Sequence, residues 1–220
     1  DTDRSRGLGD VYKRQVLRWM ALGIFMPLMR DHSARGTRRQ EAYAFEDMEA
    51  FRGIIGLRYR LLPYLYSEFM KAALKNEMYA RPLGFVWPED RIARRVEDQL
   101  LIGESIMIAP VYEQNAVGRT VYLPEEMKLL RFHGQEVTEE RVLPAGHHFL
   151  EIPLEEVVLF IRKGCLLPLA SGGENVEQVD WNQLKLYGFA EKGDSYELYD
   201  DDGVSPHVIL EENLRRIVLK

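Results

Sequence analysis

The sequence has one cysteine, no long apolar run and no excess of basic residues. Because Cys165 is the one cysteine among 220 residues, it cannot form an internal disulfide, and we expect a reducing, cytoplasmic environment. We interpret it as a buried structural thiol, since it lies in the apolar run IRKGCLLPLA. No apolar run approaches the ~20 residues that span a bilayer, so we expect no membrane association. The net charge of −6 is spread along the chain, so nucleic-acid binding is not expected.

The composition is that of a globular protein with a sizeable core. Hydrophobic residues make up 46% of the chain and charged residues 29%. Residues 1–15, DTDRSRGLGDVYKRQ, are polar without periodicity and lack the profile of a signal peptide. We interpret them as a non-native leader and the chain as a piece of a longer protein.

The first half of the chain alternates between apolar runs and helical periodicity. We expect a helix over 16–24, a strand over Phe25–Met29, a loop over 31–44, a long helix over about 45–76, a strand over Met78–Phe85 and a helix from Pro88 to about Leu101. This alternation is typical of parallel α/β sheets, in which polar groups at the carboxyl ends of strands form the active site. Arg30, Asp31 and His32 follow the first strand, so the chemistry is sought around His32.

The long predicted helix has an apolar face that also includes a charged residue. Its members are Phe51, Ile54, Ile55, Arg58, Leu61, Leu62, Leu65, Tyr66, Phe69 and Ala73. Pro63 should kink this helix or divide it in two. We expect the aromatic residues along it to pack in the core rather than to stack on a sugar.

After Pro110 the pattern changes to short strands separated by glycine, proline, asparagine and aspartate. The strand candidates are Thr120–Leu123, Leu129–Phe132, His148–Ile152, Val157–Ile161, Leu184–Tyr187 and Tyr196–Tyr199, with another at Ile106–Val111 just before them. Such spacing is typical of an all-β sandwich or barrel. The two patterns meet near residues 102–110.

Six segments resemble one family, glycoside hydrolase family 31, which contains α-glucosidases and α-xylosidases. Residues 18–32, RWMALGIFMPLMRDH, resemble its Arg-Trp-x-x-x-Gly-x-Phe-x-Pro-x-x-Arg-x-His segment. The others occur in the family's order: LRYRLLPYLY (57–66), RPLGFVWPED (81–90), EDQLLIGESIMIAPVY (97–112), GRTVYLP (118–124) and YELYDDDG (196–203).

The resemblance implies a fold that is α/β plus all-β. It comprises the last two βα units of a (β/α)8 TIM barrel, then a C-terminal β-sandwich and the start of a second one. The implied division is a leader over 1–15, the barrel end over 16–101, a proximal sandwich over 102–168 and a truncated distal β-domain over 169–220. We then expect Phe25–Met29 and Met78–Phe85 to be adjacent parallel strands with His32 at their mouth.

The resemblance also implies a retaining mechanism that acts on α-linked oligosaccharides. The family's two catalytic aspartates lie upstream of the Arg-Trp segment, so we expect no catalytic residue here and an inactive chain. His32 matches the histidine that contacts the sugar at the cleavage subsite. Arg30 should support the subsite loop, through an ion pair with Asp31 or Glu41. Gln40 and Glu41 resemble a Gln-Glu-Pro-Trp segment whose last two residues are Ala42 and Tyr43 here.

We expect no cofactor and no metal. His147 and His148 are neighbours, so on a strand they point to opposite faces and cannot share a metal ion. The acidic run Asp200–Gly203 is interpreted as a turn rather than a calcium loop. An alternative function is a non-catalytic module that binds carbohydrate or braces a partner. Such a module should expose a row of aromatics, and residues 102–220 supply few: Tyr122, Phe132, Trp181 and Tyr187.

Overall fold

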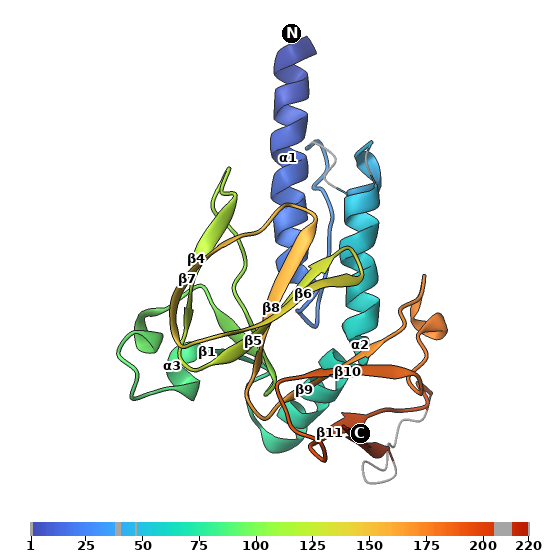
Figure 1. Ribbon diagram of the computed structural model, residues 1–220. Coiled ribbons are helices and arrows are strands. Elements are labelled where there is room, and N and C mark those ends of the chain that lie inside the picture. Colours follow the sequence, from blue (N-terminus) through green and yellow to red (C-terminus); the bar gives the residue numbers. More distant parts are fainter. Residues whose placement is uncertain (1, 38–40, 47, 205–212, 220) are drawn as a thin grey trace.

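The computed structural model describes the backbone of residues 2–37, 41–46, 48–204 and 213–219 (Figure 1). Its helical segments are α1 (Thr2–Gly23), η1 (Ala42–Ala44), α2 (Glu49–Lys75), α3 (Leu83–Val86), η2 (Ala93–Arg95) and η3 (Val176–Gln178). Its strands are β1 (Ala80–Pro82), β2 (Leu100–Ile102), β3 (Ile106–Ile108), β4 (Gly118–Leu123), β5 (Met127–His133), β6 (Glu136–Leu143), β7 (Gly146–Glu151), β8 (Glu156–Arg162), β9 (Leu166–Ala170), β10 (Leu184–Gly188), β11 (Ser195–Tyr199) and β12 (Leu214–Val218).

A six-stranded sheet forms the centre of the molecule, in the order β1-β2-β3-β8-β5-β6. Each neighbouring pair in it is antiparallel. The inner strands carry apolar side chains on both faces, and all five residues from Val157 to Ile161 are buried. A strand of this kind needs cover on both sides of the sheet.

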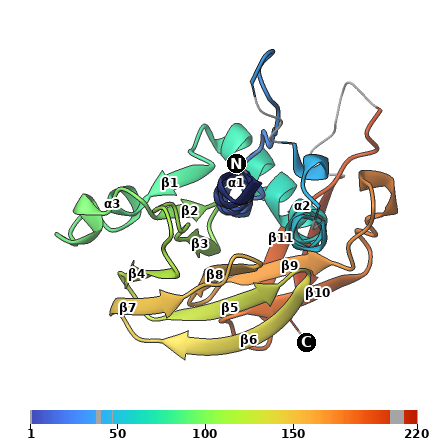
Figure 2. The same cartoon turned by 90° about the horizontal axis from the view of Figure 1, so that it is seen from above.

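Different elements pack against the two faces of the six-stranded sheet. Leu130, Leu159 and Ile161 belong to a core that also contains the apolar residues of α1 and α2. Their sheet neighbours Leu129 and Phe160 point the other way, into a second core with the β4–β7 hairpin. Figure 2 shows α1 and α2 end-on beside these layers of strands.

The remaining strands extend the fold along α2. β9 pairs with β10, β11 pairs with β12, and α2 contacts both β9 and β11. The turn between β5 and β6 also lies close to α2: a Cβ added at Gly53 would be 2.7 Å from the Cα of Gly134. Arg60 secures this contact by donating to the carbonyls of Ala170 and Gln135. Helix α2 is therefore the element that joins the helical layer to the β-rich part.

The parallel strand pair expected from the sequence is wrong. Residues 24–28 form turns and bends after α1, with Phe25 N–H donating to Leu22 C=O and Met26 N–H to Gly23 C=O. The second predicted strand is reduced to β1, which pairs antiparallel with β2. A strand persists only where a neighbour satisfies its backbone groups, and the described residues place no parallel strand beside 25–29.

Other expectations have mixed outcomes. The helix expected from Pro88 to Leu101 is wrong, because that stretch contains only turns, η2 and the start of β2. Helix α2 continues through Pro63 without division, and α1 begins at Thr2, before the predicted residue 16. The candidates after residue 118 correspond to β4, β5, β7, β8, β10 and β11, so these predictions are confirmed.

Candidate functional site

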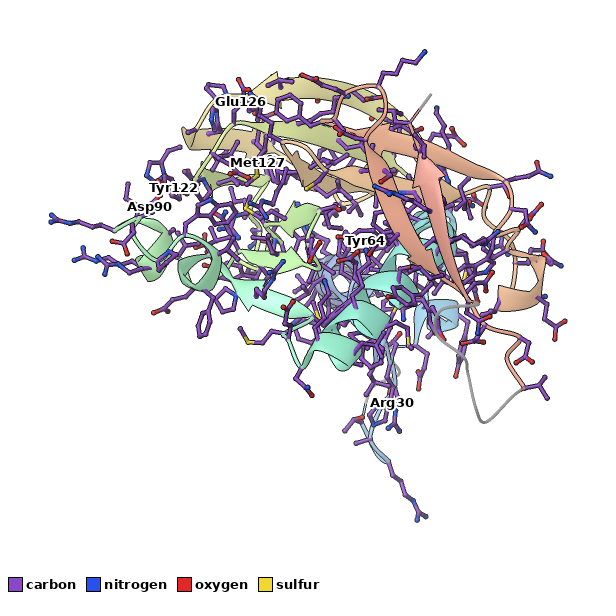
Figure 3. All side chains as sticks on the ribbon, turned by 90° about the horizontal axis from the view of Figure 1, so that it is seen from below. Arg30, Tyr64, Asp90, Tyr122, Glu126 and Met127 are labelled. Atoms are coloured by element: carbon purple, nitrogen blue, oxygen red, sulfur yellow. The ribbon has the colours of Figure 1, made fainter. Side chains whose placement is uncertain are left out.

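The candidate site lies on the segment that follows the turn after α1. Residues 29–34 have no regular structure, and Arg30, Asp31 and His32 are all exposed. In Figure 1 this segment runs back between α1 and α2, and in Figure 3 Arg30 lies on a part that projects from the body of the molecule. The imidazole of His32 is therefore open to a ligand.

Apolar contacts and polar bonds hold the two limbs of this loop against the helices. Met29, Ala42 and Phe45 pack on the core, and the ring of Phe45 stacks on Phe51 with centroids 5.2 Å apart. The N–H of Ser33 donates to Glu41 Oε1 at 3.3 Å, which links the two limbs.

The electrostatics of this loop centre on Asp31. Desolvation raises the pKa of the Asp31 carboxyl, and the charge of Glu41 raises it further. The N–H of Ala42 and the neighbouring His32 act in the opposite direction. The polar side chains of the two limbs therefore influence one another, although the loop is largely exposed.

Two side chains satisfy five consecutive backbone carbonyls at the turn before His32. Arg58 Nη1 donates to Ile24 C=O at 2.7 Å, to Met26 C=O at 2.9 Å and to Gly23 C=O at 3.4 Å. Its Nη2 donates to Pro27 C=O at 3.3 Å. The hydroxyl of Tyr79 donates to the remaining carbonyl, that of Phe25, at 2.7 Å. We call Arg58 and Tyr79 the carbonyl clamp.

Both donors of the clamp are partly buried. Burial lowers the pKa of the Arg58 guanidinium, and the nearby Tyr79 and Tyr59 act in the opposite direction. Burial also raises the pKa of the Tyr79 hydroxyl, so it stays protonated and able to donate. The last carbonyls of a helix lack partners within the helix, and here side chains of α2 and of the segment before β1 supply them.

The structure places the predicted site residues as follows. His32 and Arg30 lie two residues apart on the exposed segment. The roles of His32 and Arg30, and the ion pair expected of Arg30, stay predictions. Gln40 lies outside the described residues. The clamp was missed: the only signal for it was that Arg58 falls on the apolar face of the predicted helix.

The other polar candidates form local structure. Asp201 and Asp202 accept from the N–H groups of Gly203 at 2.7 Å and Val204 at 3.0 Å, as in Asx turns. His148 Nε2 lies 2.8 Å from the carbonyl oxygen of Pro144. Within the described ranges, no three His, Cys, Asp or Glu side chains are grouped so as to hold a metal ion. None of the described helices is long and apolar enough to cross a membrane.

Two sequence models of one family match the chain. The glycosyl hydrolase family 31 TIM-barrel domain matches residues 9–68, a range that includes His32 and Arg58. The glycosyl hydrolase family 31 C-terminal domain matches residues 76–167. The two matches together cover more than half of the chain.

Curated relatives and solved structures agree with these models. The chain is 33% identical over 192 residues to alpha-glucosidase 2 of Bacillus thermoamyloliquefaciens, covering 86% of this chain and 24% of that protein. It is 42% identical over 228 aligned residues to lysosomal alpha-glucosidase of Bos taurus, covering 92% and 23%. A Flavobacterium johnsoniae GH31 dextranase, solved with isomaltotriose, is similar at a TM-score of 0.69 and 28% identity, covering 85% of this chain and 23% of that one.

The chain spans about a quarter of the length of the curated relatives that it matches. The matched segments follow one another in the order barrel domain, then C-terminal domain, which is also the order of the helical and β-rich parts of the fold. On these matches, the chain belongs to glycosyl hydrolase family 31.

Proposed function

We propose that the complete protein is a retaining α-glycosidase that releases terminal α-linked glucose, or xylose, from oligosaccharides. The match of residues 9–68 to the family's TIM-barrel domain carries this proposal, because it includes the segment from Arg18 to His32. Relatives named alpha-glucosidase and alpha-xylosidase support the substrate class. In this proposal the chain supplies the end of the barrel domain, followed by the proximal sandwich and part of the distal one.

His32 is the residue to which we assign contact with the sugar. An imidazole can donate to one hydroxyl of a sugar ring and accept from another. Contacts to the sugar that strengthen in the transition state lower the barrier to bond cleavage. The exposure of His32 next to Asp31 supports this assignment, since the ring needs no rearrangement to meet a ligand. Arg30 supports the loop beside it.

The test compares enzymes translated from the complete reading frame. We expect His32→Ala to lower kcat/KM for p-nitrophenyl α-glucoside about 100-fold, within the range by which single transition-state contacts act. The control is His147→Ala, which changes an exposed histidine on β7. Equal activity of the two variants would remove His32 from the subsite.

The chain by itself should be inactive, because the resemblance puts both catalytic aspartates upstream of Arg18. Purified chain 1–220 should release no p-nitrophenol from the same substrate. Turnover that His32→Ala abolishes would overturn this expectation. The division at residues 15, 101 and 168 and the cytoplasmic location are part of the same proposal, with proteolysis and cell fractionation as their tests.

The alternative, a carbohydrate-binding or bracing module, depends on a row of exposed aromatics. Two of its four candidates, Phe132 and Tyr187, are buried at 0% and 5% exposure. These rings stabilise the core and are closed to a sugar. Titration of the chain with maltose separates the two functions, since saturable binding to residues 102–220 would favour the module.

A further inference from the structure

We propose that the carbonyl clamp, Arg58 and Tyr79, positions His32 for the glycosidase reaction. This inference rests on the proposed function, because it concerns how the same subsite is held. Neither side chain lies on the segment that it would control. Arg58 belongs to α2, and Tyr79 lies just before β1, so two distant parts of the chain meet at the turn.

The first step is that the clamp fixes the direction in which the backbone leaves α1. Helix α1 ends at Gly23, and residues 24–28 turn the backbone away before the segment of His32 begins. The five carbonyls from Gly23 to Pro27 all accept from the clamp, so no peptide unit in the turn can rotate without losing a bond. His32 follows only five residues after the last of them.

The second step is that a guanidinium suits this task and an ammonium does not. The planar guanidinium carries five N–H groups in a fixed fork, so one side chain can serve carbonyls on both sides of the turn. A lysine ammonium carries three N–H groups at a single point. Tyr79, which lies just before β1, supplies the donor for the carbonyl of Phe25. Phenylalanine at this position would leave that carbonyl without its donor.

The third step is that the segment downstream is weakly held in other respects. Arg30, Asp31 and His32 are exposed, and the anchors of the loop are Met29 on one limb, Ala42 and Phe45 on the other, and the bond from Ser33 N–H to Glu41 between them. The position of His32 therefore depends on the fixed turn on one side and the anchored second limb on the other. A misplacement of about 1 Å at a catalytic group can lower a rate about 100-fold.

Hydrogen exchange on the chain 1–220 tests the clamp directly. The amides of Ile24, Phe25 and Met26 donate within the turn and report its opening. Arg58→Ala and Arg58→Lys should both speed their exchange about tenfold, the effect of losing one hydrogen bond to a charged group. Tyr79→Phe should act in the same direction with a smaller effect. Strand β8 should be unchanged in all three.

The matched control is Arg52→Ala, on the same helix. Arg52 is exposed, and its partner among the described residues is Glu49, at 3.3 Å, so its loss should leave the exchange of the turn as it is. The clamp is overturned if Arg58→Lys exchanges like the parent, or if β8 loses protection as much as the turn does. The lysine variant keeps the charge and most of the packing, so it keeps the test valid should Arg58→Ala fail to fold.

Kinetics of the complete enzyme test the positioning role. Arg58→Lys and His32→Ala should each lower kcat/KM for p-nitrophenyl α-glucoside, and the double variant should be no worse than His32→Ala alone. If the losses in kcat/KM from Arg58→Lys and His32→Ala multiply in the double variant, Arg58 does not act through His32. Full activity of His32→Ala would instead overturn the proposed function. Hydrogen exchange reports on the turn alone, so its outcome is independent of that result.

Discussion

The ammonium of Lys71 donates to Glu68 Oε1 at 2.7 Å, and both side chains are almost wholly buried. The hydroxyl of Tyr196 donates to the same oxygen at 2.7 Å, and Lys71 Nζ lies 4.0 Å above the Tyr196 ring. The second oxygen of Glu68 accepts from the N–H of Glu104 at 2.8 Å. This buried cluster joins α2, the β2–β3 turn and β11, which belong to three different parts of the fold.

Removing the cation from this cluster should be strongly destabilising. In Lys71→Met the side-chain volume is nearly kept, but the Glu68 carboxylate stays buried without its partner. Breaking one half of a buried pair costs about 3–5 kcal/mol. Urea unfolding of the purified chain measures the loss in the free energy of unfolding.

The control for this prediction is Lys75→Met, one turn further along α2. Lys75 pairs with Glu104 at 3.6 Å, and both side chains are half exposed. An exposed pair of this kind contributes about 0–1 kcal/mol. Similar losses in the two variants would mean that the buried pair contributes no more than the exposed one.

Gly103→Ala should destabilise the same cluster by steric contact. Gly103 has φ +64°, and a Cβ added there would lie 2.2 Å from Glu68 Oε2. We expect a loss of more than about 2 kcal/mol, because both backbone strain and the displaced carboxylate contribute. The variant is measured by urea unfolding alongside Gly164→Ala, whose φ of +77° is similar but whose Cβ would meet open space. The difference between the two isolates the contact with Glu68, and equal losses would contradict it.

The sequence predicted the amphipathic helix and the buried strands well, because burial of one face leaves a clear periodicity. Helix α2 and strand β8 were both found at their predicted places. It missed β6, many of whose residues are charged or exposed, because β6 is the edge of the sheet and pairs there with β5 alone. It also placed a helix over the short strand β2, where three residues are too few to reveal a period.

The candidate site was predicted only in part, for a different physical reason. Residues 25–29 have the composition of a strand, but strand formation depends on neighbours that a local pattern does not reveal. His32 was selected by its motif, whereas the segment LRYRLLPYLY that includes Arg58 gives no indication of the contacts of this side chain. An arginine on an apolar helix face needs acceptors, and the carbonyls of Gly23, Ile24, Met26 and Pro27 are those acceptors.

Acid and base should both weaken the contact between Asp90 and Tyr122, which lie near one another in Figure 3. The Tyr122 hydroxyl donates to Asp90 Oδ2 at 2.5 Å. This bond is the main cause that lowers the pKa of Asp90 and raises that of Tyr122 to about 12. Asp90 contributes stability above its unfolded pKa of about 3.9 and loses it as the pH falls further. Tyr122 contributes below about pH 10 and loses its contribution as the pH rises toward 12.

Tyr122→Phe should therefore lower Tm by a constant amount between about pH 4 and pH 10, and the difference from the parent should shrink outside that window. Thermal unfolding followed by circular dichroism across this pH range measures it. Tyr43→Phe, at a residue with 70% exposure, is the control and should show no such window. A Tm difference that stays constant to pH 2.5 would contradict the role of Asp90.

Arg18 should be the residue that fixes α1 to the β-rich part. Its Nη2 donates to Ile152 C=O at 2.6 Å and to Ala116 C=O at 3.2 Å, and its Nη1 donates to Pro153 C=O at 3.2 Å. Burial is the largest cause that lowers the pKa of this guanidinium, which is half-buried against these carbonyls.

Arg18→Ala should lower the free energy of unfolding by about 2–3 kcal/mol, the range of hydrogen bonds from a charged donor. Arg14→Ala, one turn earlier at an exposed position of α1, should change it by less than about 0.5 kcal/mol. In Figure 1 the N-terminal half of α1 extends beyond the rest of the molecule, so contacts near Arg18 must hold the helix in place. Trypsin should accordingly cut α1 faster in Arg18→Ala than in Arg14→Ala. If the two variants are cut at the same rate, Arg18 does not anchor the helix, and the apolar contacts of Leu17 and Met20 suffice.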